Sequence, residues 1–210
     1  MPRESFNHAR LEAFSDGVIA VIITIMVLEL KVPSLDGVDG VRTVLPTLIL
    51  YLLSFVQVGL YWVNHHYLIE EAGPISHTTL WANLIFLFSL SLFPFVTDWI
   101  GQKHLSSFST ALYAAVSLLP GCSYTALWLT IRKHSFAPPH ASWAKLVSSI
   151  TLYLLAIPAA YVRPSFALVL IAIVSVLWIM PPSREAIRSN EAQASDDSSP
   201  QPATSHRDRR

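Results

Sequence analysis

The stretch RLEAFSDGVIAVIITIMVLELKVP, residues 10–33, decides how the chain folds. After a polar start it continues as an almost unbroken apolar series from about Phe14 to Leu30. A helix needs roughly 20 mostly apolar residues to cross the hydrocarbon core of a bilayer, which is about 30 Å thick. Small and β-branched residues dominate the stretch, and β-branching keeps side chains stiff. We therefore expect it to form the first of several membrane-spanning helices.

Five further stretches have the composition of a membrane span. Only Arg163 and Pro164 separate the last two, which predicts a tight helical hairpin, and Pro94 and Pro158 are candidate kinks. The sequence thus predicts an all-α membrane protein with six transmembrane helices. The five further spans are expected at about residues 44–63, 80–96, 108–131, 145–162 and 165–180.

The composition excludes several other classes of protein. Of 210 residues, 52% are hydrophobic and only 13% are charged, whereas a soluble domain usually carries about 25% charged residues. Fourteen basic residues balance fourteen acidic ones, so there is no basic excess to hold nucleic acid. The single cysteine, Cys122, excludes an intrachain disulfide framework and a cysteine-rich metal site. The expected surroundings of this chain are the lipid bilayer.

Three regions follow from this pattern. Residues 1–13 are expected to be a cytoplasmic N-terminus without the features of a secretory signal, and residues 14–181 the six-helix membrane domain. Residues 182–210 are polar and are expected to be a disordered cytoplasmic tail. With both termini in the cytoplasm, ten Lys and Arg residues fall on that side of the cell membrane and four on the other. The positive-inside rule favours this orientation.

The first helix carries an apolar stripe. Val18, Val21, Ile25 and Leu28 recur at spacings of three and four, so they share one helical face, and Thr24 lies beside them. Such a stripe most often serves packing, and a mid-helix threonine often bonds back to the preceding turn. The residues alone leave both the packing and a functional role open.

Ionisable residues mark both ends of the first helix. Asp16 lies within the first turns of the span, where a charged group usually faces protein or water and has a partner. It could simply cap the helix together with Arg10, or pair with a polar group on another helix. The candidates are Asn64, His65, His66, His77 and Asn83. Glu29, at the other end, is expected at the membrane interface, where it could attract cations.

The motif residues are similar to those of a known family. Arg10-x-x-x-Phe14-Ser15-Asp16 precedes a helix rich in Ile, Val and Thr that ends in Leu-Glu-Leu-Lys-Val-Pro. The second helix carries Trp62-Val-Asn64-His65-His66, and the third carries Trp81-x-Asn83-x-x-x-x-Phe88 followed by Phe93-Pro94. This pattern resembles the prokaryotic branch of the transmembrane-protein-175 family of potassium channels.

The resemblance implies a homotetramer whose four first helices line a central pore. It implies that rings of Val21, Ile25 and Leu28 form a hydrophobic constriction that acts as a gate, and that Thr24 contributes to selectivity. Family members often carry a larger residue at the position of Val21, so the constriction could be wider here. A hydrophobic ring should discriminate monovalent cations weakly, and a ring of Thr24 could supply oxygen ligands, so modest potassium selectivity is expected. No cofactor is implied beyond the permeant potassium ions.

The resemblance also assigns a structural role to the signature. Arg10, Phe14, Ser15 and Asp16 are expected to form a packing and hydrogen-bond cluster that fixes the cytoplasmic end of the pore helix. The first choices of partner for this cluster are His77 and Asn83 on the third helix.

Two other functions compete with a passive channel. A proton- or cation-coupled secondary transporter, with Asp16 or a histidine as the proton carrier, would be expected to show paired helix interruptions, and no such pair is evident. A membrane-embedded enzyme would need ionisable groups that converge deep in the helices, where the sequence offers mainly Ser and Thr. We therefore expect no enzyme. His65 and His66 point about 100° apart on a helix, which disfavours a shared metal and leaves pH modulation or structural hydrogen bonds open.

Overall fold

The computed structural model describes residues 8–70, 72–133 and 141–179, and these residues are helical with short connections. They contain no β-strand, so the prediction of an all-α membrane protein is confirmed. The predicted tail at 182–210 lies outside the described residues. The helices are α1 (His8–Leu28), α2 (Gly37–Glu70), α3 (His77–Ser91), α4 (Phe93–Gln102), α5 (Ser107–Arg132), α6 (Trp143–Val162) and α7 (Pro164–Ile179).

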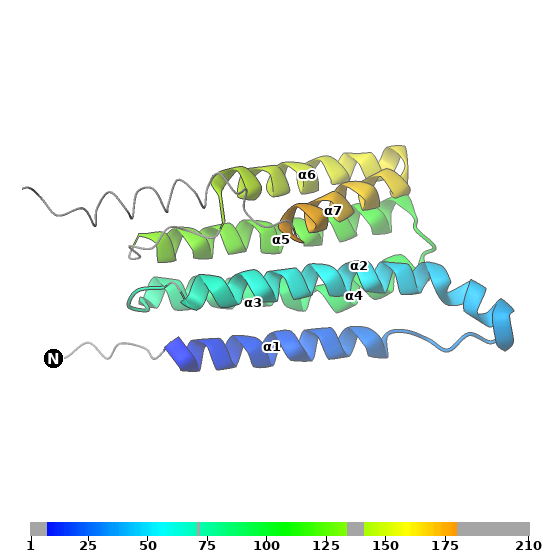
Figure 1. Ribbon diagram of the computed structural model, residues 1–210. Coiled ribbons are helices and arrows are strands. Elements are labelled where there is room, and N and C mark those ends of the chain that lie inside the picture. Colours follow the sequence, from blue (N-terminus) through cyan, green and yellow to red (C-terminus); the bar gives the residue numbers. More distant parts are fainter. Residues whose placement is uncertain (1–7, 71, 134–140, 180–210) are drawn as a thin grey trace, which may run out of the picture. The chain divides into compact units, whose positions relative to one another are not determined.

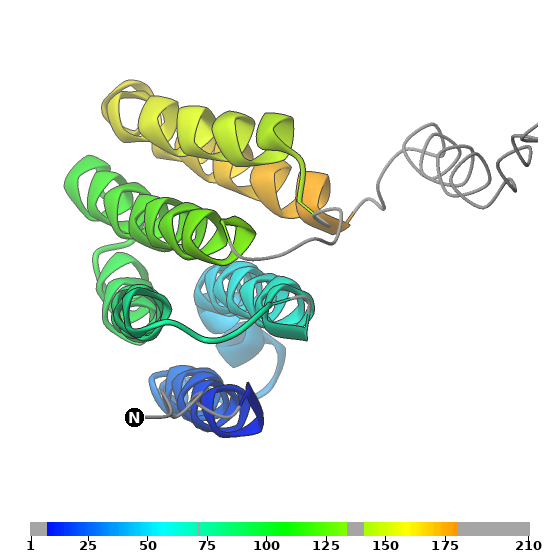
Figure 2. The same ribbon diagram turned by 90° about the vertical axis from the view of Figure 1, so that its left-hand side faces the viewer.

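The helices run side by side, as Figure 1 shows. Viewed from the end, α1 lies at one edge of the bundle and α6 and α7 lie at the opposite edge (Figure 2). The packing follows this order, because α1 contacts α2, α3 and α4, whereas α5 contacts α3 on one side and α6 and α7 on the other. The first helix therefore packs on the bundle from one side only.

Six spans account for these helices, because α3 and α4 together form the third. Together they cover His77–Gln102, and the helix is interrupted at Leu92, between Ser91 and Phe93. Pro94 lies in the first turn of α4, where its missing N–H would have no helical partner anyway. The interruption lies beside the candidate kink at Pro94, whereas α6 continues through Pro158 to Val162.

The apolar surface of the bundle agrees with a membrane environment. Five of the spans are long and apolar enough to cross a bilayer, and α7 is a shorter apolar helix of 16 residues. Many large apolar side chains point outward, among them Phe88 and Val176. A soluble monomer rarely exposes so much contiguous apolar surface. The chain is a multi-pass membrane protein.

The second helix is longer than the sequence predicts. It covers 34 residues, Gly37–Glu70, and includes Pro46, whereas the expected span was about 44–63. The apolar pattern marks only the part of a helix that lipid surrounds, and the polar turns at both ends of α2 are helical too. Gly37 begins the helix with a positive φ of 66°, which glycine adopts without strain.

A buried group of hydroxyls connects α2, α4 and α5. Ser54 Oγ lies 2.7 Å from Thr97 Oγ1 and 2.8 Å from Tyr113 Oη, and it also donates to the Leu50 carbonyl at 3.1 Å. All three hydroxyl-bearing residues are buried. Because Ser54 donates to Leu50, it accepts from the other two hydroxyls.

Replacing the phenol of Tyr113 tests this group. Tyr113→Phe removes one hydrogen bond and retains the ring, so we expect a loss of about 1 kcal/mol in the free energy of unfolding, as for other polar contacts between membrane helices. Thermal unfolding in detergent measures it. Tyr161→Phe, on the exposed side of α6, is the control and should leave stability unchanged. Equal effects of the two changes would contradict a stabilising role for the group.

Candidate functional site on the first helix

The first helix has two distinct faces. Its buried residues recur at spacings of three and four, which places them on one side of the helix against α2 and α3. The opposite side is exposed and carries the predicted stripe. The buried residues are Leu11, Ser15, Ile19, Ile22 and Met26.

The predicted ring residues all lie on the exposed side. Val21 is 54% exposed, Ile25 41% and Leu28 78%. Thr24 lies among them, and its hydroxyl donates to the backbone carbonyls of Ala20 at 3.1 Å and Val21 at 2.9 Å. The hydroxyl proton is thereby directed inward, and the lone pairs of Thr24 Oγ1 remain available on the exposed side.

A chain of hydrogen bonds fixes the buried side of α1. His65 Nε2 lies 2.7 Å from Asn83 Oδ1, Asn83 Nδ2 donates to Ser15 Oγ at 3.0 Å, and Ser15 Oγ donates to the Leu11 carbonyl at 2.9 Å. Since Asn83 Oδ1 can only accept, His65 Nε2 carries the proton. Ser15 and His65 are 0% exposed and Asn83 is 1% exposed. These hydrogen bonds thus connect α2, α3 and α1 in the interior of the bundle.

Two further pairs connect α1 to α2 along one edge. Asp16 Oδ1 accepts from Trp62 Nε1 at 2.8 Å, and Glu12 Oε1 lies 2.7 Å from His66 Nδ1. The two acids are four residues apart on α1, and Trp62 and His66 are four residues apart on α2, so each pair occupies one turn of an antiparallel helix contact. The rings of Trp62 and His66 stack, with centroids 6.4 Å apart.

The partner of Asp16 corrects the expectation from the sequence. The candidates were Arg10, Asn64, His65, His66, His77 and Asn83, and the partner is Trp62 instead. An indole N–H donates across the helix contact where a charged or amide group was expected. The i, i+4 spacing of Glu12 and Asp16 is the signal that could have indicated a shared face opposite Trp62 and His66.

The remaining signature residues are placed differently from one another. The side chain of Arg10 is exposed, and within the described part of the chain it forms no ion pair. Phe14 is 53% exposed. Of the two expected partners, Asn83 bonds Ser15, while His77 contacts the ring of Trp81 on its own helix. The signature therefore contributes one buried hydrogen bond and one edge pair, from Ser15 and Asp16.

The two adjacent histidines serve different contacts. His65 points inward to Asn83 and stacks on Phe86 with the rings 5.4 Å apart, whereas His66 points to Glu12. Among residues 8–70, 72–133 and 141–179, no group of three His, Cys, Asp or Glu side chains is placed to hold a metal ion. His65 and His66 thus each bond a residue of a different helix, Asn83 on α3 and Glu12 on α1.

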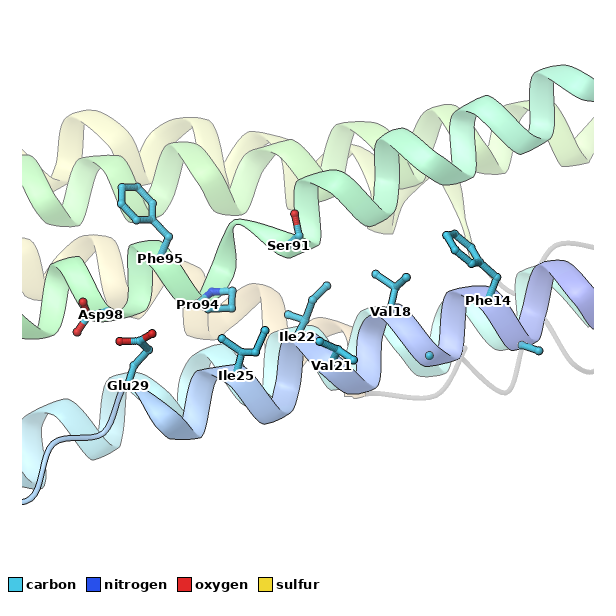
Figure 3. Close-up of a pocket in the computed structure, with 12 residues that line it drawn as sticks. Phe14, Val18, Val21, Ile22, Ile25, Glu29, Ser91, Pro94, Phe95 and Asp98 are labelled. Atoms are coloured by element: carbon cyan, nitrogen blue, oxygen red, sulfur yellow. The ribbon is translucent and has the colours of Figure 1, made fainter.

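An open apolar groove runs between α1 and the broken third span. It has a volume of about 810 Å³, and Figure 3 shows Phe14, Val18 and Ile25 on the α1 side of it and Ser91, Pro94 and Phe95 on the side of the third span. At one end, the side chains of Glu29 and Asp98 point toward one another. Asp98 Oδ2 also accepts from Gln102 at 2.6 Å. Glu29 thus faces α4 and not the side on which Leu28 is exposed.

Removing the indole N–H tests the edge contact. Trp62→Phe leaves the Asp16 carboxylate without its donor, and hydrogen bonds to charged groups contribute roughly 1.5–3 kcal/mol, so we expect a loss of that size in the free energy of unfolding. Thermal unfolding in detergent measures it. Trp81→Phe, on the exposed side of α3, removes an indole that no hydrogen bond of the described residues uses, and serves as the control. Equal losses in both variants would mean that lost ring area, and not the bond to Asp16, explains the effect.

Comparison with known proteins finds a matching family model and several relatives. Residues 10–94 match the family model described as the endosomal/lysosomal potassium channel TMEM175. A potassium channel of Chryseobacterium sp. (strain P1-3) is 39% identical over 180 residues, which cover 83% of this chain and 94% of that protein. A potassium channel of Streptomyces collinus (strain DSM 40733 / Tue 365) is 33% identical over 139 residues, covering 61% of this chain and 68% of that protein.

A solved structure shows the same fold. The crystal structure of a lysosomal potassium-selective channel TMEM175 homolog from Chamaesiphon minutus superposes with a TM-score of 0.63 and 24% identity. The match covers 87% of this chain and 98% of that one. The family match includes α1, α2 and α3, the helices that the buried hydrogen-bond chain connects. Together with a relative that is 39% identical over almost its whole length, it shows that the chain belongs to the TMEM175 family.

Proposed function

We propose that the chain is one subunit of a homotetrameric potassium channel in the cell membrane, with passive conduction and modest selectivity. The relatives that bear the name potassium channel support conduction of this ion, and they favour a channel over a coupled transporter. The observation that carries the proposal is the exposed stripe of α1, formed by Val21, Thr24, Ile25 and Leu28.

The position of α1 supports an assembly of several copies. One helix cannot enclose a pore, and α1 packs on its own bundle from one side only (Figure 2). Closed symmetric assemblies are common, and four copies around an axis would bring the four stripes together. The groove between α1 and the third span would then lie beside a neighbouring subunit. In this arrangement both termini lie in the cytoplasm, as the distribution of Lys and Arg favours.

The stripe would form the constriction of the pore. Val21, Ile25 and Leu28 follow one another over seven residues, so their rings are stacked over about 10 Å along the helix. A narrow apolar neck does not hold a continuous water column, so it can gate by dewetting. A small outward movement of the four α1 helices would then admit water and ions.

Thr24 would contribute the selectivity. Its hydroxyl proton is directed to the Ala20 and Val21 carbonyls, so its oxygen can face the permeant ion. Four such oxygens replace only part of the hydration shell of potassium, which accounts for modest selectivity. The ion itself is then the only ligand the mechanism needs, and no cofactor or catalytic step is involved.

Acidic side chains lie near the end of the stripe. Glu29 follows the last turn of α1 and points toward Asp98 on α4 (Figure 3). Several copies of this carboxylate pair near the outer mouth would raise the local concentration of cations, an effect that Lys31 partly offsets. Because the side chain faces α4, Glu29 would act through the electrostatic potential and not by lining the neck.

Currents in planar bilayers test the pore. Under a potassium/sodium gradient we expect a reversal potential shifted toward potassium. Leu28→Ala should raise the conductance by widening the neck. Thr24→Val should reduce the permeability ratio about fivefold, as a loss of about 1 kcal/mol of differential stabilisation implies.

Matched changes on α6 serve as controls. Leu154 is exposed on that helix, and Thr151 donates to the Val147 carbonyl at 2.8 Å as Thr24 does to its own turn. Leu154→Ala and Thr151→Val should therefore leave conductance and selectivity unchanged. Absence of current from folded, inserted protein, or flux that requires a counter-ion, would argue for coupled transport instead.

Cross-linking tests the tetramer. In a Cys122→Ser background, Leu28→Cys should react with a short bismaleimide to join neighbouring copies, because the four stripes meet at the axis. Leu154→Cys on α6 should stay uncoupled at the same protein concentration. Native mass spectrometry should give four times the chain mass, and a monomer mass with equal cross-linking at both positions would contradict the assembly.

A further inference from the structure

The amide of Gln57 is a buried polar group that the pore does not use. Gln57 lies in α2 and is 2% exposed. Within the described part of the chain, neither Oε1 nor Nε2 of this amide has a hydrogen-bond partner. Burying an amide in an apolar environment is strongly unfavourable unless the amide is hydrogen-bonded. A native fold rarely retains such a group without a ligand or an ordered water.

A small cavity adjoins this amide. It lies between α2, α5, α6 and α7. The volume within which the centre of a water molecule can lie is about 20 Å³. One water molecule needs roughly 10–15 Å³ by this measure, so the cavity is large enough for water and too small for an organic solute. The lining includes Gln57, Asn64, Tyr61, Tyr153, Ser175 and Trp178.

Most other polar groups around the cavity already have partners. Trp178 Nε1 donates to Ser149 Oγ at 2.8 Å, and Tyr124 Oη donates to the Asn64 carbonyl at 3.1 Å. Ser175 is the exception, because its hydroxyl lies 3.5 Å from the Ile171 carbonyl, a long and weak contact. Tyr61 and Tyr153 form a side-chain hydrogen bond with one another. The lining groups without a good partner are therefore the Gln57 amide on α2 and the Ser175 hydroxyl on α7.

We infer that this cavity is a binding site for an ordered water molecule, held by the Gln57 amide and the Ser175 hydroxyl. A buried water typically makes about three hydrogen bonds, and the amide supplies a donor and an acceptor while the hydroxyl supplies a third group. The water connects α2 to α7, two helices distant in sequence. It lies in the interior of the subunit, on the other side of α2 from α1.

Radiolytic footprinting of the full chain in nanodiscs tests the site. Hydroxyl radicals formed from a bound water modify the side chains next to it, even where bulk solvent has no access. Tyr153 lines the cavity and is 2% exposed, while Tyr113 is 0% exposed, bonds Ser54 and is not among the lining residues. We expect Tyr153 to be modified several-fold faster than Tyr113. Equal rates in the wild-type protein would overturn the inference.

Gln57→Leu provides the second measurement. Leucine has a similar volume but no polar atoms, so the cavity should become dry, and the rate at Tyr153 should fall to that of Tyr113. The melting temperature should not rise, because the wild-type amide is already satisfied by water. A melting temperature several degrees higher, or an unchanged fast rate at Tyr153, would overturn the inference. Should this variant not fold, the wild-type comparison of Tyr153 with Tyr113 decides alone.

Discussion

Hydrocarbon offers no hydrogen-bond partner, so a polar group between the helices needs a partner in the protein or a buried water molecule. The sequence of bonds from His65 through Asn83 and Ser15 to the Leu11 carbonyl meets this requirement for three helices at once. Loss of one member leaves the others unpaired in a medium of low polarity. This dependence fixes the buried side of α1, and the edge pairs to Trp62 and His66 fix its rotation.

A helix held in this way can leave its other side without partners. Val21 and Ile25 line the groove toward the third span, yet they and Leu28 remain 54%, 41% and 78% exposed, which leaves this surface available to other copies or to lipid. Apart from Ser15, the buried residues of α1 are large and apolar, so its buried side is held by close packing and one polar contact. One face of α1 holds the helix in the bundle, and the opposite face presents the exposed stripe. This arrangement explains how a protein with few ionisable groups deep in the membrane can still serve ion transport.

The helices themselves could be predicted because the apolar pattern of each span is long and clear. The interruption at Leu92 lies beside Pro94, but the pattern does not distinguish this proline from Pro158, which α6 accommodates. The contact of Asn83 with Ser15 joins two motif residues that the sequence singled out, whereas Trp62, the partner of Asp16, was not among the open candidates. Which side chains meet across two helices depends on the register between the helices, and the sequence pattern of a single helix carries no information about that register. Gln57 gave no signal, because an unpaired amide is visible only after the bundle is assembled.

The two hydrogen-bonded pairs between α1 and α2 also fix the register of the two helices. Glu12 with His66 and Asp16 with Trp62 repeat at one helical turn, so α1 could slide along α2 only in steps of about 5.4 Å, and each step would leave one pair broken. The two pairs thereby fix the position of every exposed α1 residue along the helix axis relative to the rest of its own subunit. Identical copies placed around an axis would therefore bring equivalent side chains to equal heights along that axis. Contacts within each subunit set these heights, and contacts between the copies are not needed for it.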